Sequence, residues 1–164
     1  MKWVFIVVGM LVALAAVIAI VGWSLPVKHV ASRQRTFAAS PEVVWRTITD
    51  VDAFPSWRSD VKSVERVGSA VPLTWIEQGS SGRITFAIEA SDPPRRLVTR
   101  IADPNLPFGG NWTYELAPAG AGTRLTITEN GEIYNPVFRA VARFVLGYEA
   151  TMASYLDALG KKVG

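Results

Sequence analysis

The N-terminal segment from Trp3 to Trp23 contains no charged residue and no polar side chain apart from the two tryptophans at its ends. As an α-helix, its 21 residues would be about 30 Å long, which is the thickness of the hydrocarbon core of a bilayer. Tryptophan at both ends suits the two membrane interfaces, because the indole ring is apolar but its N–H favours the headgroup level. The sequence therefore predicts a transmembrane anchor over residues 1–26.

Two other interpretations of this segment stay open at this point. A buried helix of a soluble protein can be very apolar, but such a helix normally keeps a polar stripe. A cleaved signal peptide would explain Lys2 and the two small residues Gly22 and Ser24, but its apolar region usually has roughly 7–15 residues, fewer than here. Lys28, Arg33 and Arg35 follow the segment, against Lys2 and the amino terminus before it. This balance favours a single-pass protein whose C-terminal part faces the cytoplasm.

Composition excludes several kinds of site in the rest of the chain. The formal net charge is +3, but no run of basic residues forms the concentrated face that nucleic-acid binding requires. The chain has no cysteine, so thiolate metal sites and cysteine nucleophiles are excluded. Its single histidine, His29, lies in residues 27–32, which we predict to be a juxtamembrane linker. We therefore expect no histidine-based catalytic or metal site, no metal and no cofactor.

Downstream of the predicted linker, apolar residues first follow a helical and then a strand period. A short strand is expected at 34–37, and Ser40 followed by Pro41 suits the start of a helix over 41–49. Residues 51–60, which include Phe54 and Trp57, are expected to form a one-turn helix or an ordered loop. From 61 onward, alternation and short glycine-rich links predict an antiparallel meander. Its six strands are expected at 61–67, 73–78, 83–90, 97–101, 111–116 and 124–132.

A helix is predicted to end the chain. Asn135 followed by Pro136 is typical of a helix start, and apolar residues then recur every three or four positions as far as Leu159. Gly160 is a suitable stop. One long amphipathic helix packed on one antiparallel sheet is an α+β arrangement of two layers.

Three motifs within this arrangement belong together. Residues 40–45 read SPEVVW, residues 52–57 read DAFPSW, and residues 112–116 read WTYEL before GTRLT at 122–126. In this order they resemble the START-like superfamily, also called SRPBCC, which includes polyketide cyclases and dehydrases, lipid-transfer domains and coenzyme Q-binding proteins. The resemblance covers residues 33–162. It implies the helix-grip fold, in which an antiparallel seven-stranded curved sheet wraps around a long C-terminal helix, but the fold does not specify an activity.

The resemblance also implies an apolar cavity between the sheet and the C-terminal helix. Residues that share strand faces, together with residues on the helix stripe, are the candidates for its wall. Met152 has the added advantage that its flexible thioether adapts to ligands of different shapes. The alternative for every candidate is ordinary core packing. The predicted ligand-binding residues are Trp57, Trp75, Phe86, Ile88, Trp112, Tyr114, Ile127, Tyr148 and Met152.

Three functional hypotheses follow. The first, which the sequence favours, is a membrane-anchored module that binds a lipid, quinone or isoprenoid, with the bilayer and a hydrophobic small molecule as partners. The second is a polyketide cyclase- or dehydratase-like enzyme, which would need a carboxylate inside the cavity. Glu77 and Glu129 are its candidates, because each shares a strand face with apolar residues. The third is a non-catalytic membrane scaffold whose cavity is filled by side chains.

Overall fold

The computed structural model describes residues 2–69 and 71–164. Met1, the first residue of the predicted anchor, and Ala70, in a predicted turn, lie outside the described residues. The elements follow the chain in the order α1 (Lys2–Ser24), β1 (Lys28–Phe37), α2 (Pro41–Thr49), η1 (Val51–Ser56), β2 (Val61–Arg66), β3 (Thr74–Gly79), β4 (Gly82–Asp92), β5 (Arg96–Ile101), β6 (Phe108–Ala119), β7 (Gly122–Ile133), α3 (Pro136–Val141), η2 (Ala142–Leu146) and α4 (Ala150–Val163).

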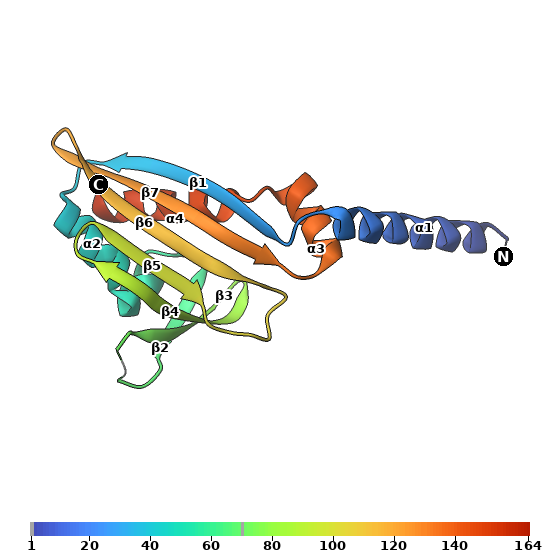
Figure 1. Ribbon diagram of the computed structural model, residues 1–164, viewed down its shortest axis with the longest axis horizontal. Coiled ribbons are helices and arrows are strands. Elements are labelled where there is room, and N and C mark those ends of the chain that lie inside the picture. The colour runs from blue at the N-terminus through green and yellow to red at the C-terminus, as the bar shows by residue number, and fades with distance from the viewer. Residues whose placement is uncertain (1, 70) are drawn as a thin grey trace.

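Helix α1 extends away from the rest of the molecule (Figure 1). It is long and apolar enough to cross a membrane, and apart from Gly22 in its last turn none of its residues is buried against the rest of the described chain. A core helix of a soluble protein would be covered, so this exposure argues against that interpretation. The helix is therefore a candidate anchor.

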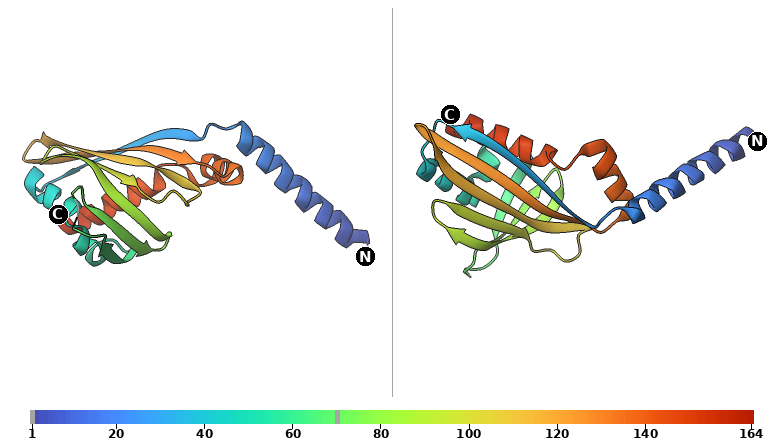
Figure 2. Two further views of the ribbon diagram at one scale, coloured as in Figure 1. Left: turned by 60° about the horizontal axis from the view of Figure 1, so that its bottom comes forward. Right: turned by 45° about the horizontal axis from the view of Figure 1, so that its top comes forward.

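The strands form one seven-stranded antiparallel sheet in the order β1-β7-β6-β5-β4-β3-β2. The sheet curves around α4, which lies against its concave face (Figure 2). Shifts of register between Val61 and Ser63 and between Ile88 and Ala90 mark bulges, which bend strands. The α+β class and the helix-grip fold are confirmed.

Two strands begin three or more residues earlier than the sequence predicts. Strand β1 starts at Lys28, which pairs with Glu132 of β7, so most of the predicted linker 27–32 belongs to the sheet. Strand β6 starts at Phe108, which pairs with Ile133. Both extensions are held by hydrogen bonds to β7, a partner that is distant in sequence from β1.

The prediction of one continuous C-terminal helix is wrong. Helix α3 continues into the π-helical turn η2, and the chain then breaks at Gly147, whose φ of 73° and ψ of 160° only glycine adopts without strain. The predicted cap at Asn135 is confirmed, because its side chain accepts a hydrogen bond from the amide of Phe138 at 3.0 Å. As a result α3 packs against the C-terminal end of α1, whereas α4 packs under the sheet.

Two clusters of buried side chains hold the domain together. The larger one joins α4 to α2 and to strands β5–β7, and Leu125 and Leu159 at its centre have no exposed surface. The smaller one joins η1 to β2 and β3 around Phe54 and Trp75. Residues of both clusters line a cavity between them.

Candidate ligand-binding cavity

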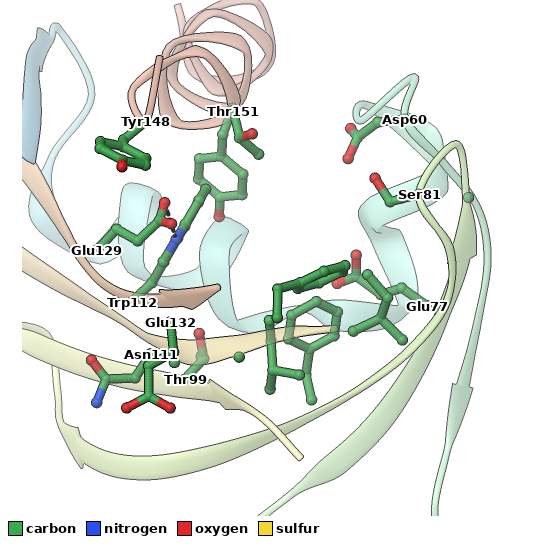
Figure 3. Close-up of a pocket in the computed structure, with 18 of the residues that line it drawn as sticks. Asp60, Glu77, Ser81, Thr99, Asn111, Trp112, Glu129, Glu132, Tyr148 and Thr151 are labelled. Atoms are coloured by element: carbon green, nitrogen blue, oxygen red, sulfur yellow. Dashed lines mark hydrogen bonds between the residues drawn. The ribbon is translucent and has the colours of Figure 1, made fainter. Parts of the chain in front are cut away.

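A cavity of about 340 Å³ lies between α4 and the concave face of the sheet. This volume is at the lower end of the roughly 300–1,000 Å³ that is usual for small-molecule sites. Its wall is mainly aromatic and aliphatic, and Figure 3 shows that side chains from the sheet and from α4 converge on it. A cavity therefore exists, whereas the scaffold hypothesis expected it to be filled.

The mouth of the cavity is marked by the lining residues that are exposed to solvent. Ser81 lies in the turn between β3 and β4, and Gly82 begins β4. Gly147 lies at the helix break, and Thr151 lies at the start of α4. Ser81 and Thr151 lie on opposite sides of the cavity in Figure 3. Phe138 of α3, which is 48% exposed, also belongs to the lining.

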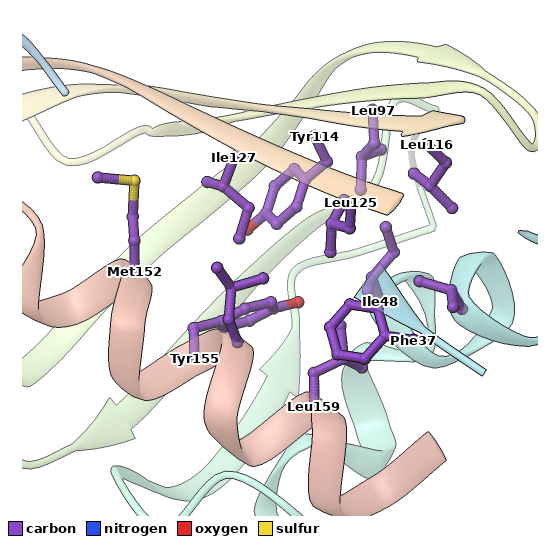
Figure 4. Packing of buried hydrophobic residues seen from close by; sticks show 12 residues of the cluster. Phe37, Ile48, Leu97, Tyr114, Leu116, Leu125, Ile127, Met152, Tyr155 and Leu159 are labelled. Atoms are coloured by element: carbon purple, nitrogen blue, oxygen red, sulfur yellow. The ribbon is translucent and has the colours of Figure 1, made fainter. Parts of the chain in front are cut away.

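The structure places five of the nine predicted ligand-binding residues on the cavity wall. These five are Trp75, Phe86, Trp112, Tyr114 and Tyr148. Ile127 and Met152 lie instead in the packed core, with no exposed surface (Figure 4). Trp57 and Ile88 pack against both core clusters. Alternation along a strand identifies the residues of one face, but α4 covers only part of that face.

Both predicted carboxylates, Glu77 and Glu129, line the cavity. Glu77 accepts a hydrogen bond from Trp75 Nε1 at 3.0 Å and forms an ion pair with Arg58, whose Nη2 lies 3.0 Å from Glu77 Oε2. Arg58 Nη2 also lies 2.7 Å from Asp60 Oδ2. This carboxylate therefore faces the cavity, but its oxygens are already engaged.

Arg58 keeps its charge although its side chain is only 13% exposed. Burial by itself would lower the pKa of Arg58, but the hydrogen bond to Asp60 and the charge of Glu77 outweigh burial and raise that pKa. The guanidinium also lies 5.4 Å from the centre of the Tyr155 ring. Arg58 thus links the carboxylate to the aromatic wall.

A second polar group forms around Glu129. His29 Nε2 lies 3.1 Å from Glu129 Oε1, and Trp112 Nε1 donates a hydrogen bond to Glu129 Oε2 at 3.0 Å. The His29 ring stacks on Tyr148, with ring centres 3.9 Å apart. The cross-strand partner of His29 is Gly131, where a Cβ would collide with the imidazole, so glycine makes room for the ring.

His29 is a cavity residue that sequence reasoning missed. We expected it in the linker, but the structure places it on β1, where its side chain is 10% exposed. A period of two extended backwards from the buried Phe37 puts Ala31 and His29 on its face. Arg33 and Arg35 fall on that face as well and are exposed, so alternation alone does not identify His29 as inward-facing. The helix break positions the stacking partner of His29, because Tyr148 directly follows Gly147.

Two phenols complete the inner wall. Burial raises the pKa of Tyr114 to about 12, and burial raises the pKa of Tyr155 well above its ordinary value. Both side chains are therefore neutral at physiological pH and present hydroxyl groups rather than phenolates.

Within residues 2–69 and 71–164, no cluster of three or more histidine or acidic residues could hold a metal ion.

The comparisons with known proteins agree with this architecture. Residues 28–164 match the family described as polyketide cyclase / dehydrase and lipid transport. The chain belongs to this family. No curated protein matches the chain in sequence.

Solved structures place this family member in the same fold as proteins of different activities. It resembles a START superfamily protein from Mycobacterium smegmatis at 19% identity, with a TM-score of 0.65 over 82% of this chain and 97% of that one. It also resembles norcoclaurine synthase from Thalictrum flavum at 14% identity, with a TM-score of 0.67 over 84% and 94%. For a di-domain ARO/CYC protein of the steffimycin biosynthetic pathway, identity is 13% and the TM-score is 0.68 over 84% and 51%. At these identities the likeness establishes the fold alone.

Proposed function

We propose that this chain is a membrane-anchored protein that binds a hydrophobic small molecule in the cavity between α4 and the sheet. The observation that carries the proposal is the wall of the cavity. It is mainly apolar, and each of the four carboxylates among its lining residues already has a hydrogen-bond or ion-pair partner; these are Asp60, Glu77, Glu129 and Glu132. A wall of this kind favours an apolar ligand with at most a small polar group.

The anchor gives the proposal its location. If α1 spans a bilayer, the cavity is held beside the lipid, which raises the effective concentration of membrane-dissolved ligands at its mouth. Family membership supports the same reading, because the family description includes lipid transport. The class of ligand we propose is therefore a membrane-resident apolar molecule, such as a lipid, a quinone or an isoprenoid.

The test narrows the mouth of the cavity with a bulky side chain. Thr151→Trp places an indole on the lining, whereas Ser154→Trp places the same group on an exposed position of the same helix, outside the lining. Full-length protein in non-ionic detergent is titrated with a pyrene-labelled fatty acid. We expect about tenfold weaker binding for Thr151→Trp and no change for Ser154→Trp. Equal affinities of both variants and the wild type would count against the cavity as the binding site.

A second candidate function rests on the Glu129–His29 pair. A carboxylate hydrogen-bonded to an imidazole can take up and return a proton, and here the pair lies on a wall that a ligand would touch. The corresponding reaction class is removal of a proton next to a carbonyl group, followed by cyclisation or loss of water.

Glu129→Gln separates the two candidates. Molecules that co-purify with the wild type and with this variant are compared by mass spectrometry. A binding protein holds the same molecule in both cases. An enzyme variant would retain an unreacted substrate, which for a dehydration is heavier than the product by one water molecule.

A further inference from the structure

An apolar surface on α3 and η2 faces solvent, although both elements belong to the folded domain. We call it the α3–η2 face, and its side chains are between 43% and 75% exposed. On the same two elements the buried residues include Arg139, Ala140 and Ala142. This distribution, with a charged residue buried and large apolar residues exposed, is the reverse of that on a normal surface helix. The face consists of Val137, Phe138, Phe144, Val145 and Leu146.

The reversal follows from how α3 is attached to α1. Arg139 Nη1 donates a hydrogen bond to the backbone carbonyl of Leu25 at 2.6 Å, directly after the end of α1. Gly22, in the last turn of α1, lies so close to the carbonyl of Pro136 that a Cβ would collide with it. These two contacts fasten α3 to the last turn of α1 and direct its apolar side chains outward.

The contact with α1 also sets how deep the α3–η2 face would lie in a membrane. Trp23 is 77% exposed and follows the glycine on which α3 rests. If α1 spans the bilayer, Trp23 lies at the headgroup level, so α3 lies there as well (Figure 1). Amphipathic segments at that level bury their apolar faces at the boundary between headgroups and acyl chains.

We propose that the α3–η2 face is a second membrane contact. It inserts into the leaflet that holds the Trp23 end of α1, and it places the mouth of the cavity against the bilayer. The proposal rests on the anchor in the proposed function. Phe138 belongs both to this face and to the cavity lining, and Gly147 of the mouth directly follows η2. A ligand could then pass between acyl chains and cavity along an apolar surface without crossing water.

The absence of cysteine from the sequence allows a direct test. Three single-cysteine variants of the full chain are labelled with an environment-sensitive NBD dye and reconstituted in phosphatidylcholine vesicles that also contain phosphatidylglycerol. Val145→Cys reports on the α3–η2 face, and Val12→Cys reports on the middle of α1. Ala121→Cys, on the exposed turn between β6 and β7, is the control. Spin labels attached to lipids near the headgroup or near the chain end quench the dye according to its depth.

We expect the dye at position 145 to be blue-shifted and quenched most by the shallow spin label. The dye at position 12 should be quenched most by the deep label, and the dye at position 121 by neither. A solvent-like dye at 145 with a quenched dye at 12 would overturn the α3–η2 contact and leave the anchor intact. A blue-shifted dye at 145 that no lipid label quenches would mean that protein covers the face, which also overturns it. An unquenched dye at 12 would refute the anchor itself.

A transfer assay tests the consequence for the cavity. Val145→Glu places a charge on the α3–η2 face, and Val145→Leu is the matched control. We expect Val145→Glu to slow the transfer of a pyrene-labelled fatty acid from donor to acceptor vesicles at least fivefold, with affinity for the same probe in detergent unchanged. Transfer at the wild-type rate by a Val145→Glu variant that is correctly folded by circular dichroism would contradict the proposal.

Discussion

Replacing Glu77 by glutamine tests the buried ion pair at the wall of the cavity. Removing one partner of a buried pair costs about 3–5 kcal/mol, because the other charge is left uncompensated. Here the side chains of Arg58 and Glu77 are 13% and 9% exposed, but Asp60 still pairs with Arg58. Glutamine also keeps an oxygen that can accept the hydrogen bond of Trp75. We therefore expect a loss near the lower limit, about 3 kcal/mol of the free energy of unfolding.

The assay is urea unfolding of the full chain in non-ionic detergent, followed by near-ultraviolet circular dichroism of the aromatic side chains. Asp60→Asn is the matched control, since Asp60 is 52% exposed and an exposed pair contributes about 1 kcal/mol or less. The double variant Arg58→Met with Glu77→Leu should recover most of the loss, because it removes both charges together. If Glu77→Gln costs no more than Asp60→Asn, water in the cavity solvates the carboxylate and the reasoning fails.

Three further predictions concern the anchor contact, the phenols and the core. Arg139→Met removes the hydrogen bond to Leu25 and should speed amide hydrogen exchange in residues 136–146 about tenfold, while exchange in β7 stays unchanged. The ordinary pKa of Tyr114 is 10.0 and its folded-state pKa is about 12, so the unfolded chain loses this proton first. The part of the free energy of unfolding that depends on this proton is fully present below about pH 10. It is lost as the pH rises toward 12, at about 1.4 kcal/mol per pH unit for one tyrosine. Tyr114→Phe should remove that part of the slope in urea unfolding, and an unchanged slope would show that the phenol is solvated. Met152 has no exposed surface, so Met152→Ala should cost about 2–5 kcal/mol. Met152→Leu should leave the affinity for the fluorescent fatty acid unchanged, and a clear loss of affinity would place Met152 on the binding surface after all.

Most strands of the sheet could be predicted because the patterns that indicate them are local in the sequence. Alternation of apolar residues and glycine-rich links identified six strands in order, and the observed strands from β2 to β7 overlap all of them. The start of β1 could not be found this way. Lys28 and Ser32 look like linker residues until β7, about a hundred positions away, supplies their backbone partners. A local sequence pattern does not predict pairing between strands that lie so far apart in the chain.

The helix break and the pairing of His29 with Glu129 were missed for the same physical reason. The apolar stripe of the C-terminal segment continues in step across Gly147, so its period shows no interruption. The direction of α3 is decided by its contact with α1, at the opposite end of the chain. His29 and Glu129 likewise meet only because β1 pairs with β7. The aromatic wall was easier to predict, since Trp112 and Tyr114 lie on one strand face.

In the proposed function, the cavity holds an apolar molecule taken from the membrane. Native mass spectrometry of the full chain, extracted from membranes in mild detergent and released in the spectrometer, tests it most directly. We expect one lipid, quinone or isoprenoid bound per chain, retained by Ser154→Trp and lost from Thr151→Trp. An empty chain that also fails to bind fluorescent apolar probes would overturn the proposed function, as would a bound molecule that Thr151→Trp does not displace.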